Sequence, residues 1–197
     1  MSDWEKIYNE KKFEIITQKP SVIISRYREI FNNKDKILDI GCGNGRNSVF
    51  LASLGCIVDA FDVADLDWYS LVLSDIKDNI LFTKNNVNTF DFKKDNYDKI
   101  ILARVIQYLD EKELLKLFEN INFSLKERGV VLISFTSEGG VFNQESVDVK
   151  KYSYQIEYIK NILDKYFTKI IITEGATESK FVNYTQKAKT YDIFVQK

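Results

Sequence analysis

The chain has 197 residues and a formal net charge of −1, with 45% hydrophobic and 29% charged residues. This length and composition fit one globular domain with a substantial core, exclude a disordered chain, and give no overall positive charge for a nucleic-acid partner. There is no histidine, so Ser-His-Asp and Cys-His catalysis and histidine-containing zinc sites are excluded.

The N-terminal segment predicts two helices, at about residues 4–16 and 21–31, which together form a helical cap over residues 1–33. Ser21, directly after the only proline, Pro20, is the expected start of the second helix. Trp4 and Tyr8 share one face of the first helix, because residues four apart lie on the same side of a helix.

From residue 36 onward, short apolar runs alternate with longer amphipathic segments. Continuous apolar runs such as KIILA and VVLISF are typical of strands covered on both faces. Asp110 is the expected N-cap of one helix, and Gly129 is its expected C-terminal stop. The predicted strands are 36–40, 57–61, 80–84, 97–103, 130–135, 169–174 and 191–196, and the predicted helices are 46–54, 65–74, 111–126 and 154–166.

Strand–helix alternation through the first five strands predicts a parallel sheet with helices on both faces. The last two strands are joined by a polar stretch without a helical pattern, GATESKFVNYTQKAKT, so they are expected to be antiparallel neighbours. The sequence therefore predicts a single α/β domain over residues 1–197: a three-layer sandwich whose seven-stranded, mostly parallel sheet has an antiparallel strand at the C-terminal end.

Three glycines follow the first strand in LDIGCGNGRN, residues 38–47. Ligands of open α/β sheets bind beyond the carboxyl ends of the strands, and glycines there permit positive φ and close approach to the backbone. A dinucleotide fingerprint needs G-x-G-x-x-G, but here Arg46 stands in the place of the third glycine. The spacing disfavours an NAD-linked oxidoreductase and leaves a nucleoside ligand without a pyrophosphate open.

Asp62 ends the second apolar run, 23 residues after Asp39. A carboxylate at the tip of the second strand can accept hydrogen bonds from both ribose hydroxyls. The alternative is that Asp62 only caps the next helix.

These residues resemble a known family. LDIGCGNGRN followed by SVFLASLGCIVDAFDVA is similar to the glycine motif and second strand of the class I, Rossmann-like S-adenosylmethionine-dependent methyltransferases, and GCGNGRNSVFLASLG is most similar to the tellurite-resistance-like subgroup. The resemblance continues through YDKIILARVIQYLD and covers about residues 36–135.

The resemblance implies a set of S-adenosylmethionine-binding residues. Asp39 and the turn Gly41, Cys42, Gly43 and Gly45 would hold the amino-acid part of the cofactor. For Arg46, binding of the cofactor carboxylate and packing as a surface helix residue stay open. The remaining implied contacts are Asp62 to the ribose, Val63 and Val87 to the adenine, Asn86 to the adenine amino group in place of the family's usual aspartate, and Arg104 near the methionine end.

Methyl transfer from a sulfonium mainly requires alignment of the acceptor, so a chain without histidine can perform it. The sequence identifies no catalytic base and no metal site, and a small-molecule acceptor is expected. The candidate acceptor contacts are Trp4, Tyr8, Gln107, Tyr108 and Phe142, each with packing as the alternative role.

Two other hypotheses stay open. One is a sensor or accessory subunit that binds the cofactor without turnover. The other is a nucleic-acid methyltransferase, from the basic and aromatic run KKYSYQIEYIK, but an ordinary surface helix with Ile156 and Ile159 facing the core is favoured.

The chain has no apolar run long enough to span a membrane, and its polar start, MSDWEKIYNE, does not read as a signal peptide. With only Cys42 and Cys56, free thiols in a reducing compartment are expected. We therefore expect a cytoplasmic monomer or homodimer with no membrane or nucleic-acid partner.

Overall fold

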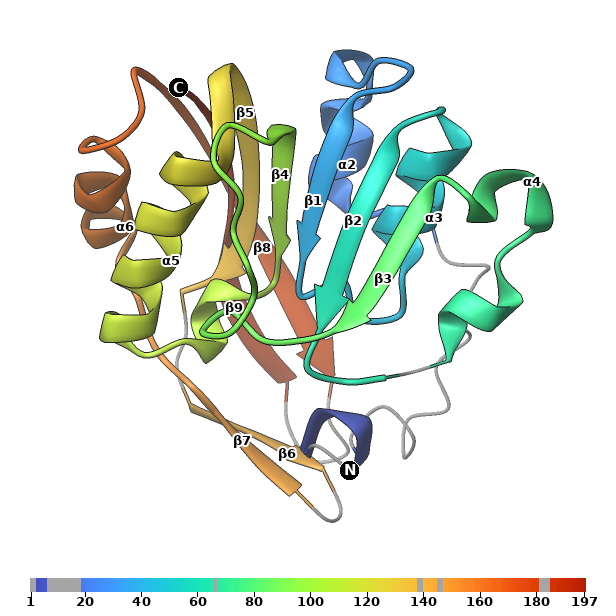
Figure 1. Ribbon diagram of the computed structural model, residues 1–197. Helices are drawn as coiled ribbons and strands as arrows, with labels where there is room; N and C mark the ends of the chain where they lie inside the picture. The colour runs from blue at the N-terminus through green and yellow to red at the C-terminus, as the bar shows by residue number, and fades with distance from the viewer. Residues whose placement is uncertain (1–2, 7–18, 66, 138–139, 145–146, 181–184) are drawn as a thin grey trace.

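The computed structural model describes residues 3–6, 19–65, 67–137, 140–144, 147–180 and 185–197. Its main sheet has seven strands in the order β3-β2-β1-β4-β5-β9-β8 (Figure 1). The first five are parallel, whereas β9 is antiparallel to both β5 and β8, as predicted. The strands are β1 (Lys36–Ile40), β2 (Ile57–Asp62), β3 (Ile80–Lys84), β4 (Tyr97–Ala103), β5 (Leu125–Thr136), β8 (Lys169–Lys180) and β9 (Thr185–Gln196).

Two hydrophobic cores lie on opposite faces of this sheet. Neighbouring residues of a strand point to opposite faces, so in β4 Ile100 and Leu102 enter one core and Ile101 enters the other. Helices α5 (Glu111–Ser124) and α6 (Ile156–Leu163) cover the first face. The second face is covered by α2 (Val22–Arg26), α3 (Arg46–Ser53) and α4 (Ser74–Lys77). The predicted three layers are confirmed (Figure 1).

Helix α5 begins as predicted and ends differently. The Asp110 side chain accepts a hydrogen bond from the Glu113 amide, and the Glu113 side chain accepts one from the Asp110 amide, which is a capping box. Gly129 is not the helix stop, because the helix ends at Ser124 and β5 starts at Leu125. Arg128 takes the left-handed conformation there, with φ 61°, and Gly129 instead gives room to the Leu125 side chain, which a Cβ would meet at 2.6 Å.

Two other helix predictions need correction. The segment predicted as one helix over 65–74 forms a 3-10 helix, η2 (Trp68–Leu71), followed by α4, because Asp67 has φ 52° and breaks the helical path. The helix predicted over 21–31 is divided into α2 and a 3-10 helix, η1 (Arg28–Ile30). Of the first predicted helix, residues 3–6 are helical, and Tyr8 lies outside the described residues.

A hairpin that the sequence did not predict, β6 (Gly140–Gln144) with β7 (Val147–Lys151), lies beside the carboxyl ends of the parallel strands (Figure 1). Strands β8 and β9 also extend six residues beyond the predicted segments, and they pair from Gly175↔Thr190 to Lys180↔Thr185. Their polar composition concealed this extension, because a two-stranded ribbon buries little apolar surface.

The basic and aromatic run at 150–160 forms the end of β7 and the start of α6. Ile159 is fully buried and Ile156 packs against the core, which confirms the expected surface helix. None of the helices among the described residues is long and apolar enough to cross a bilayer.

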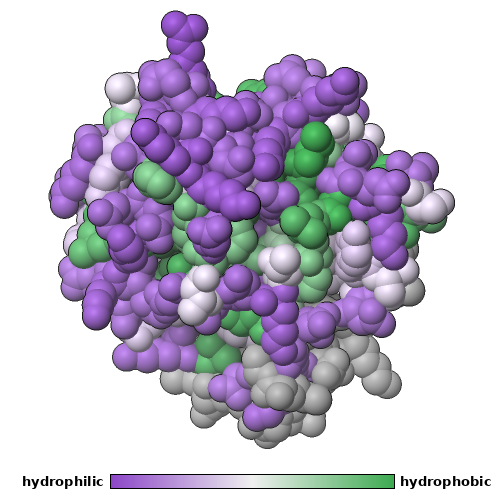
Figure 2. All heavy atoms as spheres, in the orientation of Figure 1, coloured by the Kyte–Doolittle hydropathy of each residue, from purple (hydrophilic) through white to green (hydrophobic). Residues whose placement is uncertain are grey.

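No helix lies between β3 and β4. Figure 2 shows a largely hydrophilic face on which apolar side chains gather over this part of the sheet. Ile57 of β2 and Leu81 of β3 are 43% and 61% exposed. Towards the carboxyl end of β2, Phe90 stacks on Phe61 at a centroid distance of 4.2 Å and covers the sheet in place of a helix.

Candidate functional site

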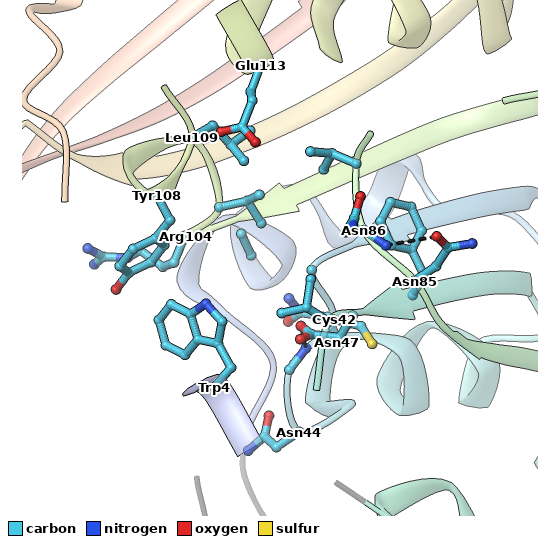
Figure 3. Close-up of a pocket in the computed structure, with 18 of the residues that line it drawn as sticks. Trp4, Cys42, Asn44, Asn47, Asn85, Asn86, Arg104, Tyr108, Leu109 and Glu113 are labelled. Atoms are coloured by element: carbon cyan, nitrogen blue, oxygen red, sulfur yellow. Dashed lines mark hydrogen bonds between the residues drawn. The ribbon is translucent and has the colours of Figure 1, made fainter. Parts of the chain in front are cut away.

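A cavity of about 530 Å³ lies at the carboxyl edge of β1, β2 and β4 (Figure 3). Its walls come from the glycine turn after β1, the end of β2, the β3–β4 loop, the residues after β4, and the N-terminal turn at residues 3–6. This is the place where open α/β sheets bind ligands, and the volume is in the range of cofactor sites.

The glycine turn between β1 and α3 has positive φ at Gly41, Gly43 and Gly45: 65°, 54° and 73°. Gly41 lines the cavity, and a Cβ on it would lie 2.6 Å from the Val105 side chain. Gly45 is not among the cavity-lining residues, and a Cβ there would lie 2.3 Å from the Trp68 ring. The third glycine is therefore required for packing, whereas Gly41, Cys42 and Gly43 form the cavity wall.

Asp62 connects the end of β2 to this turn. Its Oδ2 accepts a hydrogen bond from the Gly43 amide at 2.8 Å, and its Oδ1 accepts one from the Ala64 amide at 2.9 Å. Burial raises the pKa of Asp62, and the amides that it accepts from oppose the rise. Asp62 thus fixes the local turn but does not cap the next helix, η2, whose N-cap is Asp67, and it also lines the cavity with acceptor capacity left on each oxygen.

Asp39 lies behind the turn and is not among the residues that line the cavity. It is 1% exposed, and its Oδ2 accepts a hydrogen bond from Ser48 Oγ at 2.6 Å. Its Oδ1 has no hydrogen-bond partner in the part of the chain that the structure describes. Burial raises the pKa of Asp39 to about 7.

The β3–β4 loop forms the wall that faces the turn. Asn86 and Val87 line the cavity, and Val63 lines it from the end of β2. The Asn86 side-chain oxygen Oδ1 accepts hydrogen bonds from the backbone amides of Asn88 and Thr89 at 2.9 and 3.2 Å. The backbone amide of Asn86 donates a hydrogen bond to Asn85 Oδ1. The Asn86 side-chain oxygen is therefore engaged in shaping its own loop, which sequence reasoning did not anticipate.

The N-terminal turn spans the cavity. Trp4 packs edge-on against Tyr108, with ring centroids 4.7 Å apart and an interplanar angle of 83°. Glu5 is 7% exposed, and its Oε1 accepts from the Asp65 amide at 3.0 Å and from Lys84 Nζ at 2.6 Å. Trp4 and Tyr108 both line the cavity, as expected of acceptor contacts. Sequence reasoning missed Glu5, since one acid on an exposed-looking helix gives no signal.

Two arginines line the cavity: Arg46, the first residue of α3, and Arg104, directly after β4. Arg104 has φ 67°, and its backbone is held by a bond from its amide to Ser134 O at 2.8 Å and a bond from Gln107 Nε2 to its carbonyl at 3.0 Å. Gln107 is 2% exposed and is not among the lining residues, so it supports Arg104 instead of facing the cavity. Phe142 lies in β6, and its side chain is not described.

The other charged group in the cavity wall is Glu113, which sequence reasoning noted only as part of a helix. Its Oε2 accepts from the Asp110 amide and its Oε1 from Asn88 Nδ2 at 2.8 Å, so α5 is joined to the β3–β4 loop. Within the described ranges, no group of three or more His, Cys, Asp or Glu side chains could hold a metal. The arrangement offers backbone amides, carboxylates and guanidinium groups, and it can bind a small polar molecule that carries both charges.

Comparisons with known proteins agree with this geometry. The sequence profile of the family described as "Tellurite resistance protein TehB" matches residues 3–167. The chain is 29% identical over 130 residues to a ribosomal protein L11 methyltransferase of Campylobacter concisus, covering 64% of this chain and 42% of that protein. It is 30% identical over 103 residues to a probable S-adenosyl-L-methionine-dependent methyltransferase TehB of Haemophilus influenzae, covering 50% of this chain and 35% of that protein. The chain thus spans less than half the length of these curated relatives.

Solved structures share the fold. TehB from Haemophilus influenzae superposes with a TM-score of 0.68 at 21% identity, covering 98% of this chain and 67% of that one. A Burkholderia thailandensis 1,6-didemethyltoxoflavin-N1-methyltransferase, solved with bound 1,6-didemethyltoxoflavin and S-adenosylhomocysteine, superposes with a TM-score of 0.70 at 12% identity, covering 89% of this chain and 76% of that one. Both likenesses confirm the predicted Rossmann-like architecture.

Proposed function

This chain belongs to the TehB family, and we propose that it is an S-adenosylmethionine-dependent methyltransferase that acts on a small-molecule acceptor. The observation that carries the proposal is the pair formed by the glycine turn and Asp62: a carboxylate from the second strand holds the Gly43 amide at the mouth of the cavity. The relatives named as S-adenosyl-L-methionine-dependent methyltransferases support the choice of cofactor.

The residues present fit this cofactor. Gly41 has no room for a side chain, so the backbone is bare where a ligand would lie. Asp39 has a buried carboxylate oxygen without a partner among the described residues; it lies behind the turn and not on the cavity wall, so it adds negative charge close to the place where the ammonium end of a methionine-derived ligand would lie. A compound that has an ammonium, a sulfonium and a carboxylate needs both signs of charge, and the cavity supplies both.

The proposed roles follow from these positions. The turn at Gly41, Cys42 and Gly43, backed by Asp39 and supported by the packing of Gly45 on Trp68, holds the amino-acid part. Asp62 binds the ribose hydroxyls with its remaining lone pairs. The further proposed contacts are Val63, Asn86 and Val87 to the adenine and Arg46 to the cofactor carboxylate.

When bound, the cofactor would supply an activated methyl group: the acceptor atom would bond to the methyl carbon as the carbon–sulfur bond broke, and sulfur would keep the electron pair. The chain's own contribution is then alignment and exclusion of water, which can supply on the order of 7–11 kcal/mol of the barrier. Trp4 and Tyr108 close the cavity on the acceptor side. An amine or thiolate acceptor needs little or no protein base, whereas a hydroxyl acceptor would need one, for which the sequence offers no clear candidate.

Titration calorimetry with S-adenosylhomocysteine tests the proposal, followed by transfer of a labelled methyl group from S-adenosylmethionine to a panel of small acceptors. We expect one ligand per chain with a Kd of about 1–100 μM, corresponding to roughly 5–8 kcal/mol of binding free energy. Absence of binding at about 1 mM ligand, a limit near 4 kcal/mol, would overturn the proposal. The comparisons give no support to the alternative of a sensor without turnover.

A cytoplasmic location, a monomeric or homodimeric state and the absence of a nucleic-acid partner stay predictions.

A further inference from the structure

The two arginines of the cavity have no ionic partner among the described residues. Neither Arg46 nor Arg104 takes part in a salt bridge or a side-chain hydrogen bond there, although both line the cavity. The carboxylates that could neutralise them are engaged elsewhere. Asp62 accepts from the amides of Gly43 and Ala64, and Glu113 accepts from the Asp110 amide and Asn88.

Arg104 is also influenced by Asp192 of β9, which lies opposite Ser134 in the sheet. Asp192 is itself bonded to Arg26, with its Oδ2 2.6 Å from Arg26 Nη1. Burial lowers the pKa of Arg104, and Arg46 is near enough to lower it further. Asp39 and Asp192 act on Arg46 and Arg104 electrostatically but form no salt bridge with them, so the two arginines leave a positive potential in the cavity that a bound anion would relieve.

The proposed function already gives one of these two arginines, Arg46, a ligand group. Arg46 begins α3 directly after the glycine turn, so it is the one that can reach the carboxylate of the cofactor. Arg104 lies directly after β4, and Figure 3 shows it with Trp4 and Tyr108 on the side away from Asn85 and Asn86. A second anionic group is therefore needed on the acceptor side.

The surroundings of Arg104 indicate what kind of molecule carries that group. The Trp4 and Tyr108 rings and the side chains of Val105 and Leu109 line the cavity around it. These groups offer mostly apolar contact, and their polar atoms are the Trp4 indole N–H and the Tyr108 hydroxyl. A planar guanidinium pairs in a bidentate manner with a carboxylate, and aromatic walls contact an apolar body.

We propose that the methyl acceptor is a small organic carboxylate, with Arg104 pairing with its carboxylate group and the Trp4–Tyr108 pair contacting its apolar part. The proposal rests on the proposed function, because it assigns the acceptor half of the same cavity. The carboxylate is a handle for orientation, and a different atom of the same molecule receives the methyl group. Gln107 acts as a positioning residue, since its bond to the Arg104 carbonyl helps to hold the left-handed backbone that presents the guanidinium.

The test uses the full chain saturated with S-adenosylhomocysteine, whose binding is measured first. Matched pairs of probes are then titrated by calorimetry: benzoate against benzamide, phenylacetate against phenylacetamide, and sodium selenite as an inorganic oxyanion. The variants are Arg104→Gln, Arg104→Lys, and Arg28→Gln as a control that removes an exposed arginine of η1.

We expect at least one carboxylate to bind about tenfold or more tightly than its amide, as a charge-assisted pair requires. Arg104→Gln abolishes this preference, Arg104→Lys keeps part of it, and Arg28→Gln leaves it unchanged. Affinity for S-adenosylhomocysteine stays within about threefold in all three variants, because the proposal moves Arg104 from the methionine end of the cofactor, where the family resemblance placed it, to the acceptor.

The outcomes that overturn the proposal differ from one another. If S-adenosylhomocysteine does not bind, the proposed function fails and the inference fails with it. If it binds and no carboxylate exceeds its amide, or selenite alone binds, only the acceptor assignment is wrong. If Arg104→Gln weakens S-adenosylhomocysteine binding more than about tenfold and leaves the carboxylate preference intact, Arg104 serves the cofactor instead.

Discussion

The Asp62 carboxylate accepts a hydrogen bond from the Gly43 amide at 2.8 Å, and this bond joins the end of β2 to the turn that follows β1. Asp62 ends β2, and Gly43 lies in the turn just after β1. These two strands are parallel neighbours, paired from Lys36↔Ile57 to Ile40↔Phe61, so the sheet register brings the two residues together. The same carboxylate is thus a structural element of the glycine turn and the proposed ribose ligand.

We predict that Asp62→Asn lowers the affinity for S-adenosylhomocysteine by about tenfold to a hundredfold, because it replaces one charge-assisted acceptor by a donor beside a backbone amide. Calorimetry on the purified variant measures the change. Asp59→Asn is the matched control, since Asp59 lies in the same strand and accepts instead from Tyr97 Oη at 2.9 Å. Equal losses in both variants would show that the effect is only on the stability of β2.

We predict that Gly45→Ala destabilises the fold by about 3 kcal/mol, the sum of a left-handed backbone cost and an overpacked ring contact. The added Cβ would lie 2.3 Å from the fully buried Trp68 ring. In a Trp68→Leu background the same substitution should cost only about 1–2 kcal/mol, because the contact is gone and the backbone cost remains. Urea unfolding of the four proteins measures both values, and identical penalties in the two backgrounds would contradict the packing role.

The glycine turn also shows what sequence can and cannot establish. The spacing of Gly41, Gly43 and Gly45 predicted the turn and its place after the first strand, because positive φ at such positions is local chemistry. Gly45 faces Trp68 and not the cavity because of the path of the chain after β2. Asp67 takes a left-handed conformation before η2, and no periodic apolar pattern in the sequence signals it. Tertiary contacts of this kind leave no local pattern.

The strands of the fold likewise divide into those that local sequence predicts and those that it does not. Strands β1, β3 and β4 were predicted with their observed bounds and β2 to within a residue, whereas β5 begins at Leu125, five residues before its predicted start. The polar ribbon of β8 and β9 and the hairpin of β6 and β7 were missed, since their stabilisation comes from backbone pairing between segments of ordinary polarity. The sequence placed Gln107 near the site but did not show which way its side chain points. The 3-10 turn at Ile106–Tyr108 buries Gln107 and directs Tyr108 to the cavity instead.

We predict that Asp39 makes stability depend on pH. Burial raises its pKa to about 7 from 3.8, so the folded state binds the proton more tightly than the unfolded state. The associated stability is fully present below about pH 4 and is lost as the pH rises towards 7, at up to about 1 kcal/mol per pH unit. Asp39→Asn removes this titrating group, so the free energy of unfolding of the variant should fall less steeply with rising pH than that of the unmodified protein. Urea unfolding at pH 5, 6, 7 and 8 compares the two proteins, and parallel curves would contradict the prediction.

We predict that Glu5→Ala releases the N-terminal turn from the cavity. Glu5 accepts from the Asp65 amide and from Lys84 Nζ, so it links the N-terminal turn to the segment after β2 and to the end of β3. Hydrogen exchange at the Asp65 amide should accelerate about tenfold or more when a buried charge-assisted acceptor is removed. Lys6→Ala is the control, because within the described turn Lys6 bonds to exposed Asp3, at 3.2 Å. Unchanged exchange in Glu5→Ala would contradict the role given to Glu5.

The chain's two tryptophans occupy opposite environments, and this gives the protein a built-in optical reporter. Trp68 is sealed beneath the glycine turn with 0% exposure, so its emission should be blue-shifted and insensitive to acrylamide or iodide. Trp4 faces the cavity against Tyr108, so its emission should respond when the cavity fills. Fluorescence of the unlabelled protein can therefore separate cavity occupancy from unfolding in one experiment: occupancy changes the Trp4 component alone, and unfolding shifts both components to the red.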